Sequence, residues 1–177
     1  MKAANQLSDF LKNPALSTYR ERLIEHIVIA DLVQAAVRSG RILIVSRSEV
    51  DVWGYDIVLN CGKVSRSIQL KSSKKGSVKV SLSLEEIIGS CIVRAIPTVS
   101  HDESKISLSY RLFESGFTQG LKLSKFSPAK ASRWIKNKEG MTVRKIRPNH
   151  VSVPQSAFSQ AMDADALFGA LFPKNKI

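Results

Sequence analysis

Two short apolar segments joined by a tight turn constrain the fold of this chain more than any other feature. Tyr55–Leu59 and Val64–Lys71 are rich in aliphatic residues, and residues 60–63 between them have the composition of a hairpin turn. Because side chains alternate faces along a strand, Gln69 and Lys71 are expected on the same side. The hairpin therefore predicts a sheet in which polar side chains interrupt buried strands.

The segments around this hairpin predict a mixture of helices and strands. A short helical turn is expected over residues 7–13, followed by a long helix from Ser17 to about Ser39 that ends at Gly40. Three more helices are expected: one from Leu84 with Ser83 and Glu86 as a capping box, one from Ser127-Pro128 to about Asn137, and Ser156–Leu171. Further strands are expected at Arg41–Ser46, Val78–Leu82, Cys91–Val99, Lys105–Phe113, Thr142–Ile146 and His150–Val153.

The chain contains no internal repeat and no low-complexity linker, so residues 1–177 are expected to form a single α/β domain. Two cysteines, Cys61 and Cys91, are too few for a disulfide framework and are expected to be reduced and partly buried. The N-terminus lacks the apolar core of a signal peptide, and no apolar run reaches the roughly 20 residues that span a bilayer. A cytoplasmic protein is expected.

The charge balance indicates a polyanionic partner. Lys and Arg number 27 against 15 acidic residues, which gives a net charge of +12. Such an excess favours DNA, RNA or an anionic membrane surface, although a merely solvated basic face is the simpler alternative. The one-sided basic excess between residues 120 and 150 makes nucleic acid the preferred partner.

Four polar residues stand in an order that resembles a known family. Glu25 lies on the long helix, Asp56 opens the first hairpin strand, and Gln69 and Lys71 lie on the second. This order resembles the core of the PD-(D/E)XK nuclease superfamily, which includes many restriction endonucleases and the archaeal Holliday-junction resolvases. The resemblance covers about residues 18–82. It implies a restriction-endonuclease-like α/β fold, with a mixed central sheet flanked by helices and an uncharacterised elaboration over residues 83–177.

The resemblance also implies an activity, the metal-dependent hydrolysis of phosphodiester bonds in DNA. Asp56 would ligate Mg²⁺ or Mn²⁺ directly, together with the side-chain oxygen of Gln69 and the backbone carbonyl of Leu70. Glu25 would bind the metal through water or bind a second ion, and Lys71 would hold the attacking water or stabilise negative charge. Such a site suits the chemistry, because a metal neutralises the phosphate and Mg²⁺ needs only one or two carboxylates.

The sequence departs from the family pattern at Gln69, where Asp or Glu is usual, and at Tyr55, where the motif has proline. Glutamine keeps an oxygen donor but removes a full charge, so metal affinity falls unless Glu25 compensates. This change leaves open a second hypothesis, a DNA-binding module that keeps the fold without catalysis.

Each candidate residue also has a purely structural interpretation. Asp56 is a common turn residue, and Lys71 can protect a sheet edge from aggregation. Glu25 can be a solvated helix residue paired with Arg22, one turn back, with Glu21 as an unfavourable like charge. A third hypothesis, a basic RNA-associated protein unrelated to the superfamily, predicts that Asp56 and Lys71 lie far apart.

Residues expected to contact nucleic acid fall in two groups, one beside Lys71 and one between residues 120 and 150. Trp134 in the second group either stacks on an exposed base or anchors its helix to the core. Asp51 and Glu49, in the loop before Asp56, are expected in solvent or near the metal. The candidate contacts with nucleic acid in these two groups are Ser72, Ser73, Lys74, Lys75, Lys79, Arg133, Lys136, Arg144, Lys145 and Arg147. A homodimer is expected if both DNA strands are cut.

Overall fold

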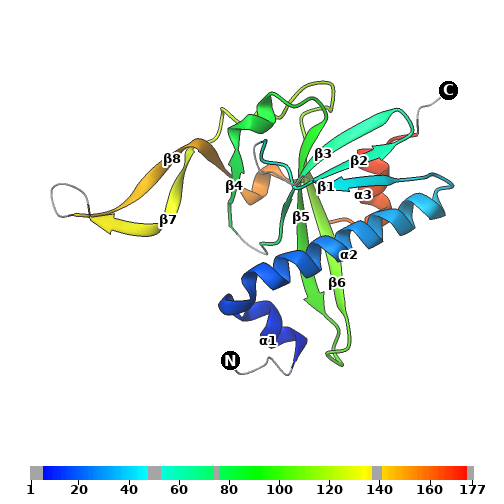
Figure 1. Ribbon diagram of the computed structural model, residues 1–177, viewed down its shortest axis with the longest axis horizontal. Helices are drawn as coiled ribbons and strands as arrows, with labels where there is room; N and C mark the ends of the chain where they lie inside the picture. Colours follow the sequence, from blue (N-terminus) through cyan, green and yellow to red (C-terminus); the bar gives the residue numbers. More distant parts are fainter. Residues whose placement is uncertain (1–5, 48–52, 74–75, 137–140, 175–177) are drawn as a thin grey trace.

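The computed structural model describes residues 6–47, 53–73, 76–136 and 141–174. Its elements form a long helix, two sheets and a short C-terminal helix (Figure 1). In chain order they are α1 (Leu7–Lys12), η1 (Pro14–Leu16), α2 (Ser17–Arg38), β1 (Ile44–Arg47), β2 (Ile57–Cys61), β3 (Val64–Lys71), β4 (Val78–Ser81), η2 (Leu82–Glu85), β5 (Ser90–Val99), β6 (Ile106–Phe113), β7 (Pro128–Lys136), β8 (Thr142–Val153), η3 (Gln155–Ala157) and α3 (Ala164–Leu171).

The larger sheet has five strands in the order β1-β2-β3-β5-β6. The predicted hairpin is confirmed, with Ile57 paired to Ile68 and Cys61 to Val64 across β2 and β3. Strands β3 and β5 are parallel, whereas the other neighbouring pairs are antiparallel. The central sheet is therefore mixed, and the connection between its parallel strands contains β4 and η2.

Helices α2 and α3 cover one face of the large sheet. The apolar residues Ile24, Val28 and Leu32 recur along α2 at helical spacing and are buried against strand residues such as Ile57 and Ile68. The Tyr110 hydroxyl on β6 donates a hydrogen bond of 2.5 Å to the Asp31 carboxylate on α2, which fastens helix to sheet. The long helix predicted from Ser17 is thus confirmed, and it ends one residue before Ser39.

The opposite face is covered by a three-stranded antiparallel sheet in the order β4-β8-β7. A second apolar core lies between the two sheets, with Ile92 and Phe113 from the large sheet packed against Val80, Val151 and other buried residues. Among the described residues, helices therefore flank one face of the central sheet, because the second sheet occupies the other. Figure 1 shows β7 and the first part of β8 projecting away from the rest of the molecule.

The helix predicted from Leu84 is wrong, since only the short 3₁₀ segment η2 forms there. The expected capping residue Ser83 is engaged elsewhere, because its hydroxyl donates to the carbonyl of Trp53 at 2.7 Å. The Glu85 carboxylate accepts hydrogen bonds from the backbone N–H groups of Leu123 and Ser124, both at 2.6 Å. These tertiary contacts end the segment before a second helical turn can form.

The helix predicted from Ser127-Pro128 is also wrong, because this segment is β7. Proline is tolerated as the first residue of a strand, where its missing N–H disrupts no ladder. Buried Ala129 between exposed Pro128 and Lys130 shows the alternation of a strand. The two short strands predicted around Pro148 are one strand, β8, whose register with β7 shifts between Ala129↔Arg147 and Pro128↔Val151. An irregularity of this kind accommodates Pro148.

The predicted final helix is much shorter than expected, because α3 begins only at Ala164. Asp163 caps it, its carboxylate accepting from the N–H of Ala166 at 2.8 Å. Of the preceding residues, Gln155–Ala157 form the short 3₁₀ segment η3, and Met162 exchanges backbone hydrogen bonds with Tyr110 on β6. Pairing with the sheet edge thus overrides the helical pattern of this segment.

Two smaller expectations can also be compared with the structure. Cys61 and Cys91 are both free and buried, and burial raises the pKa of the Cys91 thiol well above its usual value. Within the described ranges, no helix combines the length and apolar character needed to cross a bilayer.

Candidate functional site

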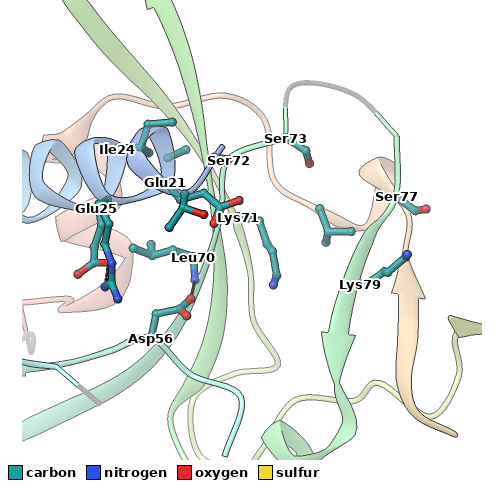
Figure 2. A pocket seen from close by; sticks show the side chains of 14 residues that line it. Glu21, Ile24, Glu25, Asp56, Leu70, Lys71, Ser72, Ser73, Ser77 and Lys79 are labelled. Atoms are coloured by element: carbon teal, nitrogen blue, oxygen red, sulfur yellow. Dashed lines mark hydrogen bonds and ion pairs between the residues drawn. The ribbon is translucent and has the colours of Figure 1, made fainter. Parts of the chain in front are cut away.

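A cavity of about 760 Å³ opens between the first half of α2, the end of β3 and the start of β4. Its walls come from distant parts of the chain, since α2 packs on one face of the large sheet and β4 belongs to the sheet on the other. Figure 2 shows these side chains around the shared space. The charged residues lining the cavity are Glu21, Arg22, Glu25, Asp56, Lys71 and Lys79.

Asp56 is positioned by the edge of the hairpin. Ile57 is the residue paired with Ile68, yet the N–H of Asp56 also donates to the Ile68 carbonyl at 2.8 Å. Two consecutive residues thus lie opposite one residue of β3, as in a β-bulge, and bulges re-aim side chains. The Asp56 carboxylate accepts a 2.6 Å hydrogen bond from the N–H of Leu70 through Oδ2. The carboxylate is exposed and borders the cavity beside Leu70.

The approach to Asp56 depends on Gly54. Its φ of +74° lies in the left-handed region, which glycine adopts readily. A Cβ at this position would lie 2.6 Å from the Cβ of Ser81, so the loop passes against the end of β4 too closely for a side chain. Glycine at position 54 therefore allows the loop before β2 to pass beside β4, which places Asp56 at the cavity.

Lys71 and Gln69 lie on the same strand but in different surroundings. Lys71 is the last residue of β3, is half-buried, and lines the cavity. Gln69 lies opposite Ile92, a member of the core between the sheets, and is only 8% exposed. Its Oε1 is buried with no hydrogen-bond partner in the described part of the chain, and Gln69 is not among the described residues that line the cavity. Its role as a metal ligand stays a prediction.

Glu25 is held by two arginines. Arg22 approaches its Oε2 at 3.1 Å and Arg47 on β1 approaches its Oε1 at 3.1 Å, with 12% of the Glu25 side chain exposed. The ion pair with Arg22 is the one expected from the structural interpretation of this residue. Both carboxylate oxygens thus have a cationic partner, although Glu25 still borders the cavity.

Glu21 and Thr18 are cavity residues that sequence reasoning did not select. They precede Glu25 by four and seven residues, the spacing that puts side chains on one helix face. This spacing is visible in the sequence, but it carries no information about which helix face borders the hairpin. Glu21 is exposed and is one helical turn from Glu25, so it adds a second helix carboxylate to the cavity.

The loop after Lys71 is held by a buried arginine. The guanidinium of Arg94 donates to the carbonyls of Ser73 at 2.7 Å and Gly76 at 2.9 Å, and to the Ser73 hydroxyl at 3.2 Å. Burial, with Arg111 directly opposite on β6, lowers the pKa of the Arg94 guanidinium below its ordinary value. The hydroxyls of Ser72, Ser73 and Ser77 belong to residues lining the cavity, so Arg94 positions part of its wall.

The predicted nucleic-acid contacts are divided between the cavity and the projecting strands. Ser72, Ser73 and Lys79 line the cavity. The residues on the projecting strands are Arg133 and Lys136 on β7 and Arg144, Lys145 and Arg147 on β8. Of these five, the structure describes the side chain of Arg147, which is exposed. Lys74, Lys75, Glu49 and Asp51 lie outside the described residues, as does the side chain of Trp134.

The donors around the cavity are oxygen atoms of carboxylates, hydroxyls and backbone. Over the described ranges, no three His, Cys, Asp or Glu side chains lie close enough to hold a metal together. Mg²⁺ keeps several waters and is commonly bound by one or two carboxylates, and the cavity offers Asp56 and Glu21 in that capacity. Hard cations fit this donor chemistry better than zinc, which takes four nitrogen, sulfur or carboxylate ligands.

Comparison with protein-family models, with curated proteins and with solved structures found no match to this chain.

Proposed function

We propose that this protein is a metal-dependent DNA endonuclease with its active site in the cavity between α2, β3 and β4. The observation that carries the proposal is that Asp56 and Lys71 line one cavity, with Glu21 and Glu25 from the facing helix. A carboxylate pair and an ammonium around one cavity suit phosphodiester hydrolysis. The proposal also draws on the net charge of +12, which favours a polyanionic substrate.

The residues that would hold Mg²⁺ or Mn²⁺ are Asp56, Glu21 and the backbone carbonyl of Leu70. When bound, the ion would neutralise phosphate charge and supply a water of lowered pKa. Lys71 contributes a positive charge where negative charge develops on the phosphate. The serine hydroxyls of the loop held by Arg94 provide neutral hydrogen-bond donors to phosphate oxygens.

A second candidate function, a DNA-binding module without catalysis, is favoured by two specific observations. Gln69 is turned into the core between the sheets instead of lining the cavity, and both oxygens of Glu25 are paired with arginines. Among the described residues that line the cavity, the other carboxylates are those of Asp56 and Glu21. The RNA-associated alternative is disfavoured, because it expects Asp56 and Lys71 to lie far apart.

Nicking of supercoiled plasmid in Mg²⁺ or Mn²⁺, with and without EDTA, tests the proposal. We expect cleavage that needs the metal and that falls by about 100-fold or more in Asp56→Asn and Lys71→Ala. Asparagine keeps an acceptor for the Leu70 N–H, so Asp56→Asn separates the loss of charge from a loss of folding. Lys63→Ala, an exposed lysine in the β2–β3 turn, is the matched control and should cleave normally. Wild-type protein that binds duplex DNA but cuts with neither metal would contradict the nuclease and support the binding module.

A further inference from the structure

A basic two-stranded ribbon projects from the molecule beyond the second sheet. Strand β4 pairs only with the last residues of β8, from Val78↔Val153 to Ser81↔His150. Residues 142–149 of β8 therefore pair with β7 alone, in the segment from Ala129↔Arg147 to Lys136↔Thr142. We call β7 together with residues 142–149 the basic ribbon. Figure 1 shows it extending away from the rest of the molecule.

The ribbon concentrates the charge of the chain. Its two strands contain six basic residues and no acidic residue, a net charge of +6, which is half of the +12 of the whole chain. The described side chains of Lys130 and Arg147, on opposite strands, are exposed. Ile146 is exposed as well, at 56%. A surface that combines strong positive charge with an exposed apolar side chain is typical of nucleic-acid contacts.

The shape of the ribbon matches one groove of duplex DNA. Paired strands lie about 4.8 Å apart, and eight extended residues span roughly 25 Å. The major groove of B-DNA, about 12 Å wide, admits a two-stranded ribbon, whereas the major groove of duplex RNA is deep and too narrow for protein side chains. Apolar side chains in the major groove contact the thymine methyl group.

Strand β8 connects the ribbon with the wall of the candidate site, because its last residues pair with β4, from Ser81↔His150 beside the ribbon to Val78↔Val153 at the cavity. Val78 and Lys79 on β4 line the cavity and pair with Val153 and Ser152 at the end of β8. A duplex whose phosphate enters the cavity therefore meets the strand that continues into the ribbon. We infer that the basic ribbon docks into the major groove of duplex DNA and supplies binding affinity separately from the residues of the cavity. This inference rests on the proposed function in one respect, that the substrate is duplex DNA.

Fluorescence anisotropy with a 30-base-pair DNA duplex, measured over a series of salt concentrations, tests this inference. In Lys130→Ala/Arg147→Ala we expect the Kd to rise by about 10-fold or more. The slope of log K against log salt should fall by about 2, or one for each lost phosphate contact. The control is Lys63→Ala/Lys105→Ala, which removes two exposed lysines at the hairpin turns of the large sheet. It should bind within about twofold of wild type, as long-range charge is screened beyond about 10 Å.

Duplex RNA of the same sequence tests docking in the groove as opposed to general charge attraction. Wild type should prefer DNA over RNA, and Lys130→Ala/Arg147→Ala should lose most of that preference. Groove docking would be overturned if wild type bound both duplexes with equal affinity. It would also be overturned if the ribbon variant and the control lost equal affinity for DNA. The experiment distinguishes failure of the proposed function from failure of the ribbon proposal. A wild-type protein that binds no duplex DNA contradicts the proposed function itself, whereas binding that is unchanged in the ribbon variant contradicts the ribbon alone.

Discussion

Arg94 is among the largest side chains that this fold buries completely, and its hydrogen bonds close the loop beside the cavity. A buried guanidinium is tolerated when backbone carbonyls accept from its N–H groups, as those of Ser73 and Gly76 do for the two terminal nitrogens. The Nε of Arg94 has no hydrogen-bond partner in the described part of the chain. Its ring contact with Phe158, 5.3 Å from the guanidinium carbon to the ring centroid, adds a cation–π interaction. One residue thereby links the core between the sheets to the wall of the candidate site.

Replacing Arg94 by methionine should destabilise the protein. The carbonyls of Ser73 and Gly76 would lose their donor, at about 1–3 kcal/mol for each group that stays buried. The matched control is Arg38→Met, which breaks an ion pair with Asp165 whose partners are 53% and 57% exposed, and should cost less than about 1 kcal/mol. Urea denaturation of the three proteins measures both changes. Equal stability of the Arg94 and Arg38 variants would contradict the role of Arg94.

At the residue scale, the sequence predicted that Asp56 and Lys71 lie near each other, because a tight hairpin leaves little freedom of register, and both residues line the cavity. The sequence did not indicate that the second sheet would cover the side chain of Gln69. Alternation places Gln69 and Lys71 on one face, but the second sheet packs over that face at Gln69 and stops short of Lys71, the last residue of β3. Which residue of a strand is covered depends on an element far away in the chain.

At the element scale, η2 and the segment after β6 hold each other in place. The Glu85 carboxylate accepts two N–H groups from Leu123 and Ser124, and the N–H of Leu121 donates to the Leu84 carbonyl at 3.2 Å. The backbones approach so closely that a Cβ on Gly120 would lie 1.8 Å from the carbonyl oxygen of Glu85. This contact shapes the segment that precedes β7.

Gly120→Ala should therefore separate the two segments and destabilise the fold by about 1–3 kcal/mol or more, because backbone atoms have to move. Gly169→Ala is the control with the opposite sign. Gly169 lies within α3 with open space around its Cβ position, so alanine there should stabilise by about 0.5–1 kcal/mol through helix propensity. Thermal unfolding by circular dichroism shows whether the two Tm values move in opposite directions; a shared direction would contradict this account.

Two segments show that tertiary contacts can override a local helix signal. The capping box at Ser83 and the proline after Ser127 are ordinary helix signals, yet neither segment is an α-helix. In both cases pairing or hydrogen bonding with a distant segment satisfies the backbone better than a short isolated helix would, since short helices are marginal in water. The 22-residue helix α2 has a continuous apolar face, and its bounds were predicted almost to the residue.

At the scale of the whole molecule, stability should decrease from the central sheet to the tip of the basic ribbon. Strands β3 and β5 lie inside a five-stranded sheet and are covered on both faces, whereas residues 142–149 pair with one strand only. A two-stranded hairpin by itself is marginally stable. The ribbon is thus the part of the fold that gains most from a bound partner.

Native-state hydrogen exchange followed by mass spectrometry measures this gradient. Amides of β3 and β5 should exchange by global unfolding, and amides of β7 should exchange about 100-fold faster or more through local opening. A saturating DNA duplex should slow exchange in the ribbon far more than in α3, on the helix-covered face. Uniform exchange over both sheets, in the free protein, would contradict the gradient.

The sequence by itself determined the long helix, the β2–β3 hairpin, the β5–β6 pair and the basic character of residues 128–149, because these features rest on local periodicity, turn residues and charge. Only the tertiary structure decided that β4, β7 and β8 form a second sheet, that Gln69 is buried beneath it, and that Asp56, Lys71 and Glu21 share one cavity. The physical reason is that strand pairing and burial are settled between segments distant in the chain. The free energy of those contacts exceeds the small local preferences that a sequence displays.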